Sequence, residues 1–332
     1  MARPLLVRLP NWLGDLVQAL PVVRAAAEDP SRPAVFVGLA PFLELLKPRF
    51  PASAFLPWSR ERRFAAVGAI RRHHPGTALL LTDSLSSAIL MALAFVPERI
   101  GYAAEFRDAF LTRRVPRAAA ARTAPRVEEY RALARAAGLA VAETFPRVEA
   151  LPEERRGAAA LLRRAGIPDG PFAVLAPGAS YGPAKRWDPE NFAKLASALA
   201  RGGTRSLLVG AGEDAEPAAE VARAAGGAAY DLVGATDLGS LTGLLDQSIL
   251  VASNDSGVMH LAAALGKPTV AVFGSTSPVW SAALMPWVRS LYAAYPCSPC
   301  FRRTCPIGYG CLRSIDASQA HEAAEELLAV AR

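Results

Sequence analysis

The 332-residue sequence lacks the features that mark membrane, secreted and disordered proteins. No apolar run reaches the roughly 18 to 20 residues that a membrane-spanning helix needs. The N-terminus, MARPLLVRLPNWLGD, has neither a long apolar stretch nor a convincing cleavage site, so it does not resemble a signal peptide. Charged residues make up 20% of the chain and apolar residues 52%, which excludes intrinsic disorder. We therefore expect a globular, cytoplasmic protein with room for two domains.

Several nucleotide- and nucleic-acid-binding motifs are also missing. The sequence has no G-x-G-x-x-G or Walker A pattern and no helix-turn-helix, RRM or zinc-finger signature. Its net charge of +7 still predicts an acidic partner, which could be nucleic acid, anionic lipid or a phosphorylated substrate. The excess of arginine and alanine is equally typical of a high-GC genome, so charge alone does not decide among these partners.

Cysteine is scarce, and the four cysteines lie together in CSPCFRRTCPIGYGC, at Cys297, Cys300, Cys305 and Cys311. Disulfides are not expected in a cytosolic protein. A C-x-x-C pair followed by two further thiols is consistent with a structural zinc or iron–sulfur site. Because the segment is short, a loop that merely carries thiols is the alternative. Nothing else in the sequence requires a catalytic metal.

Short apolar runs alternate with helical patterns, which predicts parallel α/β sheets. In the first half, strands are expected at 4–10, 34–39, 54–57 and 77–82, and helices at 15–27, 42–46, 60–72, 86–94 and 127–138. In the second half, strands are expected at 172–176, 206–209, 230–232, 248–253 and 269–273, and helices at 153–165, 189–201, 237–245 and 258–265. A linker near 140–153 would separate domains 1–150 and 151–332. Two similar halves with a cleft between them suit a two-substrate enzyme.

The stretch ASNDSGVMHLAAALGKPTVAVFGSTSP carries the strongest functional signal. Asn254, Asp255, Ser256 and Gly257 follow a predicted buried strand and begin a helix. Ligands bind beyond the carboxyl ends of parallel strands, and the unpaired N–H groups of a helix N-terminus favour phosphate. An acid there either caps the helix or binds a hydroxyl or ammonium. His260 faces the same side of the helix, as a ligand contact or as a packed core residue.

The loop PGASYGPAKRW, residues 177–187, follows another strand and projects from the same edge of the same sheet. Gly178 and Gly182 let the backbone approach a ligand, although loops at strand ends often need glycine anyway. Lys185 can reach a phosphate. Glu213 and Asp214, on the same edge, are candidates for accepting hydrogen bonds from ribose hydroxyls.

The first half offers two carboxylates and a basic segment. Asp15 ends the loop NWLGD, where it is either a helix cap or a carboxylate at a cleft, and Asp83 follows the strand at 77–82. Seven arginines fall between residues 99 and 126: Arg99, Arg107, Arg113, Arg114, Arg117, Arg122 and Arg126. They form either a solvated surface or a patch for an anionic acceptor.

Three motifs, NWLGDLVQALPVVRA, PGASYGPAKRW and NDSGVMHLAAALGKPTVAVFGSTSP, occur in the order in which they appear in the ADP-heptose–lipopolysaccharide heptosyltransferases, and the chain resembles that family, most closely the type II enzymes. The segments RIGY..EFR and CSPC…CP.GYGC are also similar. The resemblance covers nearly the whole chain. It implies a GT-B fold, in which two Rossmann-like domains face a central cleft, with the acceptor on the N-terminal domain and the nucleotide sugar on the C-terminal one.

The resemblance further implies inverting transfer of heptose from ADP-L-glycero-D-manno-heptose to the first heptose of the Kdo–lipid A inner core, with no cofactor or catalytic metal required. Its partners would be ADP-heptose, the lipid acceptor and the cytoplasmic face of the inner membrane, where the protein would bind peripherally, and not nucleic acid. The last helix would pack back on the N-terminal domain. Arg126 stands where relatives often carry a histidine shortly before a Val-Glu pair.

The resemblance also implies roles for individual residues. Asp15 would be the carboxylate near the acceptor, and Lys185 would contact the phosphates during catalysis. The expected donor-binding residues are Gly178, Ser180, Tyr181, Lys185, Arg186, Glu213, Asn254, Asp255, Ser256, Gly257 and His260. The expected acceptor-binding residues are Asn11, Trp12, Gly14, Asp83, Arg99, Arg107, Arg113 and Arg114.

Two other classes of function remain open from the sequence. One is a different nucleotide-sugar transferase or epimerase on the same fold, including one that serves another heptose position, which donor profiling would identify. The other is a basic nucleic-acid-binding protein, which would bind DNA in a salt-sensitive way and would not bind an ADP sugar.

Overall fold

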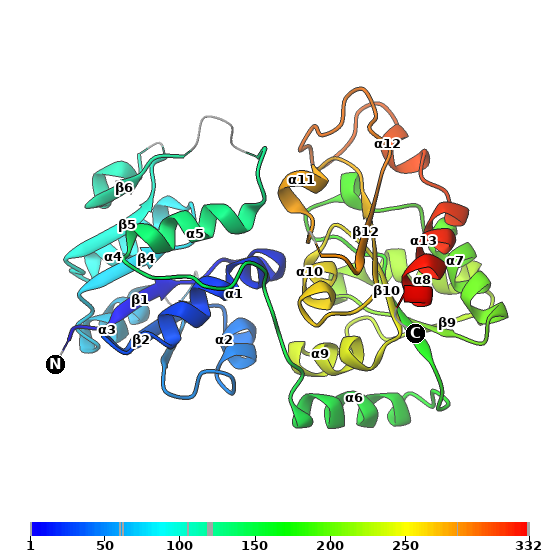
Figure 1. The fold of residues 1–332 in the computed structure, drawn as a ribbon, viewed down its shortest axis with the longest axis horizontal. Coiled ribbons are helices and arrows are strands. Elements are labelled where there is room, and N and C mark those ends of the chain that lie inside the picture. The colour runs from blue at the N-terminus through cyan, green and yellow to red at the C-terminus, as the bar shows by residue number, and fades with distance from the viewer. Residues whose placement is uncertain are drawn as a thin grey trace. The chain divides into compact units, whose positions relative to one another are not determined.

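The chain divides into two compact units, Met1–Pro146 and Arg147–Arg332. The computed structural model describes residues 2–59, 61, 63–104, 106–117, 122–283 and 285–330. The division falls inside the segment 140–153, where the sequence predicts a linker. Each unit is an alternation of strands and helices built around one parallel sheet (Figure 1).

The first unit has a six-stranded sheet in the order β3-β2-β1-β4-β5-β6, with every pairing parallel. Its strands are β1 (Leu5–Arg8), β2 (Ala34–Gly38), β3 (Ala54–Pro57), β4 (Thr77–Leu80), β5 (Glu98–Tyr102) and β6 (Arg113–Val115). Its helices are α1 (Leu13–Ala27), α2 (Ala40–Leu46), α3 (Arg63–Arg72), α4 (Leu85–Leu93) and α5 (Arg126–Ala136), with a 3₁₀ turn at Asp108–Phe110.

Both faces of this sheet are covered, which is why its strands are short, continuous apolar runs. On one face, Leu6, Val35 and Leu80 pack against Ile70 of α3 and Met91 of α4. Helices α1 and α5 pack on each other, and α5 also contacts β4, β5 and β6. The burial of β1 and β2 is complete along their lengths.

The second unit has a six-stranded parallel sheet in the order β12-β11-β10-β7-β8-β9. Its strands are β7 (Phe172–Ala176), β8 (Arg205–Leu208), β9 (Ala229–Asp231), β10 (Leu250–Asn254), β11 (Thr269–Phe273) and β12 (Val288–Tyr292). Its helices are α6 (Pro152–Arg164), α7 (Pro189–Arg201), α8 (Ala215–Ala224), α9 (Leu238–Gln247), α10 (Gly257–Ala264), α11 (Pro278–Ser281), α12 (Gly310–Arg313) and α13 (Ala317–Val330), with 3₁₀ turns at Pro183–Lys185 and Gly212–Asp214.

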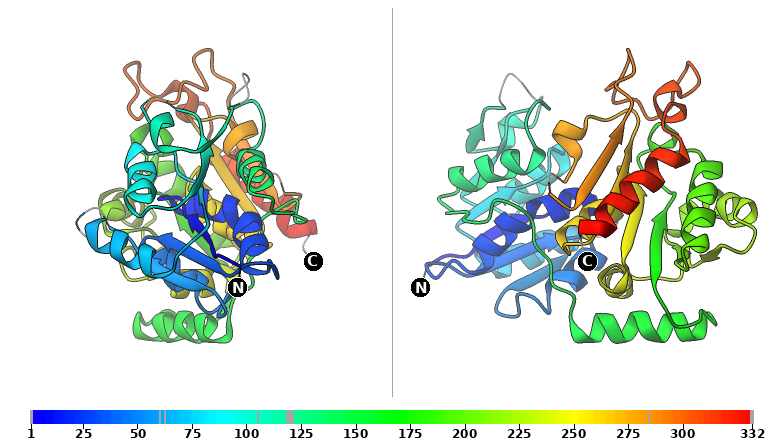
Figure 2. Two further views of the ribbon diagram at one scale, coloured as in Figure 1. Left: turned by 90° about the vertical axis from the view of Figure 1, so that its left-hand side faces the viewer. Right: turned by 45° about the vertical axis from the view of Figure 1, so that its right-hand side comes forward.

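The last helix, α13, lies against α7 and the strands β11 and β12 of the second unit (Figure 2). Its buried residues Ala320, Ala324 and Leu327 belong to the same hydrophobic core as Trp187 and Phe192, which lie just before and within α7. In the described part of the chain, no helix is both long and apolar enough to cross a bilayer.

Three strands were not expected from the sequence: β5, β6 and β12. β6 and β12 are the edge strands of their sheets, and most of their side chains are not buried. An edge strand need not read as an apolar run, because solvent rather than a helix covers part of it. β5 and β6 lie in the arginine-rich stretch that the sequence predicted as a basic surface. Residues 60 and 62 of the predicted helix 60–72, and residues 105 and 118–121 of the basic segment, lie outside the described residues.

The two sheets share one topology. In each sheet, the first strand of the unit lies beside its fourth strand. The second and third strands follow on the side of the first, and the fifth and sixth follow on the side of the fourth. The pairs are β1 with β4 and β7 with β10. Ligands of doubly wound sheets bind where the strand order reverses, beyond the carboxyl ends of the strands. The segments that follow these four strands, including the first turn of the next helix, are therefore the candidate sites. They contain Asp15, Asp83, the loop 177–187 and the turn 254–257.

Candidate functional site

In the second unit, the turn after β10 leads into the exposed N–H groups of α10. Ser256 is the N-cap residue, with extended backbone, but its side chain makes no capping hydrogen bond. Its hydroxyl instead lies 2.9 Å from the Ser253 hydroxyl. Ser256 and Gly257 are both partly exposed. The first turn of α10 thus keeps backbone donors and a positive dipole end available to an anion.

Asp255 does not cap this helix, and the other role that the sequence allows, binding an ammonium and hydroxyls, is the one observed. Its side chain is buried and lies 2.6 Å from Lys185 Nζ. It accepts hydrogen bonds of 2.6 Å from the hydroxyls of Thr276 and Ser281. Burial alone would raise the pKa of Asp255, but the charges of Lys185 and His260 and the hydrogen bonds from Lys185 and Ser281 bring it below its ordinary value.

Lys185 is therefore held in place before any ligand binds. Its ammonium donates to the Asp255 carboxylate and to the Asp255 carbonyl at 3.3 Å, and it lies 4.9 Å from the centre of the Tyr181 ring. An ammonium has three N–H bonds, so one remains for a further acceptor. His260 is buried, with Nε2 3.9 Å from Asp255 Oδ1, and whether it also contacts the donor stays a prediction.

Asn254 ties the loop 177–187 to the end of β10. Its Oδ1 accepts from the Trp187 backbone N–H at 2.9 Å, and its Nδ2 donates to the carbonyls of Pro177 at 2.7 Å and Gly178 at 3.2 Å. The side chain is fully buried. The structure thus gives Asn254 a role in positioning the loop, and its predicted contact with the donor stays a prediction.

Gly178 lies against the buried carboxylate of Asp214, whereas the sequence predicted the neighbouring Glu213 as the donor-binding residue. A Cβ at Gly178 would lie 2.0 Å from Asp214 Cγ, so no other residue fits beside Asp214. Asp214 is buried, its Oδ2 accepts from the Ala211 N–H at 3.1 Å, and burial raises its pKa. Glu213, the expected ribose contact, is exposed, as is Ser180, and Arg186 is partly exposed.

The cysteine segment packs on this loop. The Tyr181 hydroxyl donates to the Phe301 carbonyl at 2.5 Å, and Ala184 N–H donates to the Arg303 carbonyl at 3.0 Å. Arg303 also lies over the Tyr181 ring, at 5.4 Å from its centre. Residues 301–303 therefore buttress the loop that carries Lys185.

The four thiols differ in environment. Cys305 Sγ accepts from the Tyr309 N–H at 3.3 Å, and the N–H groups of Ile307 and Tyr309 lower its pKa. Cys311 is buried, and burial raises its pKa. Cys297 is exposed and Cys300 partly exposed. Across the described residues, no three His, Cys, Asp or Glu side chains are grouped as a metal site requires.

In the first unit, Asp15 forms an ion pair. It lies in the first turn of α1, where Trp12 and not Asp15 is the N-cap residue. Its Oδ1 is 2.9 Å from Nε of Arg126, the first residue of α5, and that Nε also donates to the Tyr130 hydroxyl at 3.1 Å. Both charged side chains are about four-fifths buried, at 21% and 18% exposure. Asp15 thus presents an arginine-bound carboxylate at the carboxyl end of β1.

The residues before Asp15 surround the same end of β1. Asn11 Oδ1 accepts from Arg8 Nη2 at 2.8 Å, and the Arg8 guanidinium lies over the Trp58 ring, 4.3 Å from its centre. Arg8 is fully buried, and burial lowers its pKa to about 10. Trp12 is 49% exposed, which leaves a large aromatic side chain open at this edge. Gly14 is partly exposed in the first turn of α1.

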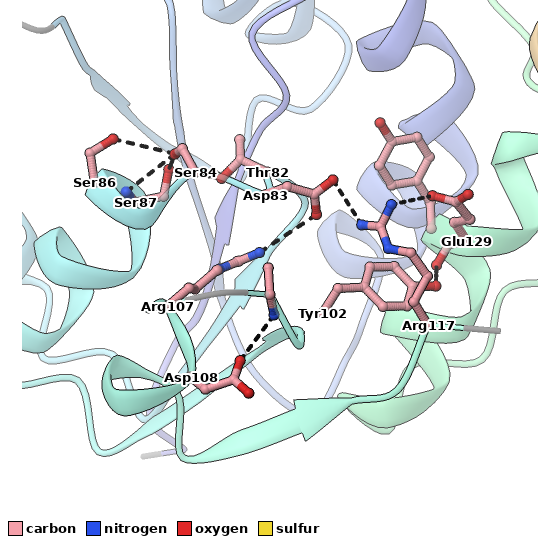
Figure 3. A network of polar contacts seen from close by, with 12 residues as sticks. Thr82, Asp83, Ser84, Ser86, Ser87, Tyr102, Arg107, Asp108, Arg117 and Glu129 are labelled. Atoms are coloured by element: carbon pink, nitrogen blue, oxygen red, sulfur yellow. Dashed lines mark hydrogen bonds and ion pairs between the residues drawn. The ribbon is translucent and has the colours of Figure 1, made fainter. Parts of the chain in front are cut away.

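Asp83, after β4, is the second carboxylate at this edge and sits between two arginines (Figure 3). Arg117 Nη2 is 2.8 Å from Asp83 Oδ2, and Arg107 Nη1 is 3.5 Å from Oδ1. Arg117 also reaches Glu129 of α5 at 3.7 Å and lies over the Tyr102 ring, 4.7 Å from its centre. Asp83 is 45% exposed, whereas the Arg107 side chain is 1% exposed. Arg107 therefore contacts Asp83 from the buried side, while the Asp83 side chain stays partly exposed to solvent.

The other predicted acceptor arginines do not join this group. Arg99 donates to the carbonyls of Phe110 at 2.7 Å and Val96 at 2.6 Å, so its guanidinium is engaged with the backbone around β5. Arg113 pairs with Glu98 at 3.8 Å, and Arg114 is exposed on the edge strand β6.

Sequence reasoning missed three supporting residues of these sites, Arg8, Glu129 and Tyr130, and it named Arg117 only as part of the basic segment. A buried arginine in β1 breaks an otherwise apolar strand, which is a signal that could have identified Arg8. The spacing of Arg126, Glu129 and Tyr130 places them on one face of a helix, and this could have indicated a shared polar face. Arg117 had no local signal that set it apart from its neighbouring arginines.

Comparison with known proteins gives a consistent result. The model of glycosyltransferase family 9 (heptosyltransferase) matches residues 63–309. Lipooligosaccharide heptosyltransferase 2 of Haemophilus influenzae is 30% identical over 287 residues, covering 83% of this chain and 75% of the relative. Lipopolysaccharide heptosyltransferase 2 of Escherichia coli is 28% identical over 292 residues, covering 82% and 83%.

The solved structure of the E. coli ADP-heptose lps heptosyltransferase II superposes with a TM-score of 0.84 at 26% identity, covering 99% of both chains. The two parallel six-stranded sheets are those of the GT-B fold of such enzymes. The family model spans most of the chain, including both switch-point loops of the second unit. The chain therefore belongs to glycosyltransferase family 9, the heptosyltransferases, and is a glycosyltransferase.

Proposed function

We propose that the protein transfers heptose from ADP-L-glycero-D-manno-heptose to the first heptose of the Kdo–lipid A inner core, with inversion at the anomeric carbon. One observation supports the donor side of this proposal. Lys185, paired with Asp255, and the N-terminus of α10, which has no side-chain cap, both lie at the switch point of the second sheet. A cation and a row of backbone N–H groups are what a pyrophosphate needs. The names of the relatives supply the sugar and the pathway.

Departure of ADP leaves negative charge on the β-phosphate. Lys185 and the N–H groups of α10 offset this charge as it develops, because they are already ordered before the donor arrives. Asp255 keeps the ammonium of Lys185 in position, and Asn254 keeps the loop that carries it at the end of β10. Asp214 and Glu213 are the carboxylates available to ribose hydroxyls on this edge.

Inversion requires one direct attack by the acceptor hydroxyl on the anomeric carbon, past an oxocarbenium-like state. We assign the base that deprotonates the hydroxyl to Asp15, which is held next to Arg126 at the carboxyl end of β1. Asp83, fixed between Arg107 and Arg117, would accept hydrogen bonds from other hydroxyls of the acceptor sugar. The transfer itself needs no metal or cofactor.

The acceptor in this proposal is a membrane glycolipid, so the enzyme would act from the cytoplasm at the inner-membrane surface. The exposed Trp12 beside Asp15 and the net charge of +7 favour such a surface, which carries apolar and anionic groups. Nucleic acid has no part in it.

The test is incubation of the protein with ADP-heptose and heptosyl-Kdo–lipid A, followed by mass spectrometry of the lipid. The expected product is heavier by one heptose. ADP-mannose, UDP-glucose and the acceptor without its first heptose serve as comparisons. Transfer from another nucleotide sugar, or to another heptose position, would identify a different transferase of the same family.

A structural metal at the four cysteines is a second part of the proposal, resting on their spacing and on the thiolate-favouring N–H groups at Cys305. The described thiols are not gathered as ligands, so a metal would have to draw them together. We expect about one zinc or iron per chain in protein purified without chelator, and its release in Cys300→Ser. Metal-free protein with full stability and turnover would leave these residues as loop thiols.

A further inference from the structure

The contact between Asp15 and Arg126 is the starting point. Arg126 is the first residue of α5, and its side chain reaches across to the first turn of α1. Arg126 Nε lies 2.9 Å from Asp15 Oδ1 and donates a hydrogen bond of 3.1 Å to the Tyr130 hydroxyl. The arginine also lies over the Tyr130 ring, 5.6 Å from its centre. Asp15, Arg126 and Tyr130 thus form one group at the switch point of the first sheet.

We propose that Arg126 is a positioning residue for the transfer reaction: its fixed positive charge keeps the Asp15 carboxylate directed into the acceptor site and keeps it ionised to a lower pH than an unpaired carboxylate would be. This inference rests on the proposed function, in which Asp15 is the base. An arginine differs here from the histidine that the resemblance leads one to expect at this position, because a histidine loses its charge near neutral pH.

The guanidinium of Arg126 stays protonated. Burial would lower the pKa of Arg126, but its contacts with Tyr130 and Asp15 raise it above its already high ordinary value. Tyr130 is fully buried, and burial and the nearby Asp15 raise the pKa of its hydroxyl, so it stays neutral. The group therefore contains one permanent cation, Arg126, and one neutral phenol, Tyr130, beside the Asp15 carboxylate.

The other charged groups around Asp15 do not replace Arg126. From β1, Arg8 bonds Asn11, and its guanidinium is stacked on Trp58. From the loop after β4, Asp83 is engaged with Arg107 and Arg117. From α5, the charge of Glu129 acts on Arg126, and Glu129 pairs with Arg117 at 3.7 Å. Within the described residues, the ion pair shown for Asp15 is the one with Arg126.

The alternative is that the ion pair merely fastens α1 to α5, which pack on each other. The two roles predict different results. A fastening role lowers thermal stability and leaves the pH dependence of the reaction unchanged. A role in holding the base ionised moves the acidic limb of the rate profile, because a neighbouring cation lowers the pH at which a carboxyl loses its proton.

The experiment compares single-turnover rates of heptose transfer, at saturating acceptor, from pH 4.5 to 9 in the wild type, Arg126→Gln and Arg126→Lys. We expect the acidic limb of Arg126→Gln to move to higher pH by about 1 unit or more, the shift that loss of an adjacent opposite charge gives a carboxyl. Arg126→Lys keeps a cation, and its limb should stay within about 0.5 unit of the wild type by the same argument.

Arg131→Gln is the matched control, because Arg131 is on the same helix and pairs only with Glu128 among the ion pairs shown for it. It removes the same charge without touching Asp15, so its acidic limb should stay in place. An unchanged limb in Arg126→Gln, even with a lower rate or melting temperature, would overturn the inference. An equal shift in Arg131→Gln would also overturn it, since the effect would then come from net charge.

A second readout separates this inference from the proposed function. Carbon-13 NMR of aspartate-labelled protein follows the Asp15 carboxyl directly, with Asp15→Asn to assign its signal. An upward shift of its titration in Arg126→Gln supports the inference even if the protein transfers no heptose. If the wild type transfers heptose but the Asp15 titration is not shifted in Arg126→Gln, the inference about Arg126 is wrong while the proposed function stands.

Discussion

Asp15→Asn is expected to slow heptose transfer by about 100- to 10,000-fold, the range that general base catalysis typically contributes. Asparagine has the same shape as aspartate and still accepts a hydrogen bond from Arg126, so the local packing is kept. It cannot take a proton from the attacking hydroxyl. The measurement is turnover at saturating ADP-heptose and acceptor, together with the melting temperature and the Kd for ADP.

Asp29→Asn is the matched control for this prediction. Asp29 also belongs to the first unit and also forms an ion pair, with Arg32 at 3.0 Å, but it follows α1 rather than β1. Its loss should leave turnover within about twofold of the wild type, because Asp29 lies in the loop that leads into the amino end of β2, whereas ligands bind beyond the carboxyl ends of the strands. Near-normal turnover in a folded Asp15→Asn protein would remove Asp15 from the chemistry.

Asp255→Asn should have the largest effect on stability. Asp255 is buried, and its replacement leaves the Lys185 ammonium without its anionic partner. Removal of one member of a buried ion pair costs about 3 to 5 kcal/mol. For a unit of this size the melting transition should fall by roughly 6 to 20 °C. Because Lys185 loses its position, donor affinity should fall as well.

Two further variants test the reason for this loss. Asp246→Asn breaks the ion pair with Arg155, whose side chain is 52% exposed, and should change the melting temperature much less than Asp255→Asn does, because solvent screens an exposed pair. Combining Asp255→Asn with Lys185→Met removes both charges, and the double variant should recover much of the lost stability. A double variant as unstable as the sum of the single ones would show that the charge pair is not the cause.

The same pair gives a pH dependence. The folded-state pKa of Asp255 lies below its ordinary value, so its contribution to stability is present above the unfolded-state pKa and is lost as the pH falls through the folded one. The melting temperature of the wild type should therefore drop on acidification below about pH 4, and that of Asp255→Asn should depend less on pH over this range.

Most of the fold could be predicted from the sequence because the sheet interiors are buried on both faces. Strands such as β7 and β11 are runs of apolar residues, and their predicted bounds, 172–176 and 269–273, agree with the structure. β6 and β12 could not be predicted in the same way. They are edge strands in which arginines and serine face outward, and their partners are chosen by long-range pairing.

The sequence predicted which loops form the candidate site, but not which side chains in them contact one another. Sequence placed Asp255 and Lys185 on one sheet edge, but not in one ion pair, because their side chains meet only after β7 and β10 become neighbours. Arg99 and Arg107 looked equivalent in the sequence, yet one bonds backbone carbonyls and the other lies behind Asp83. Burial, which decides between these roles, is a property of the packed unit.

The hydrogen bonds of Asn254 also bear on the thermodynamics of binding. Its amide joins Pro177, Gly178 and Trp187, the two ends of the loop, to the last residue of β10. A loop fixed in this way has already lost its conformational entropy during folding, so the donor does not have to order it on arrival. The amides at both ends of the loop should then exchange with solvent only when the end of β10 opens, and hydrogen exchange would show them as one cooperative unit.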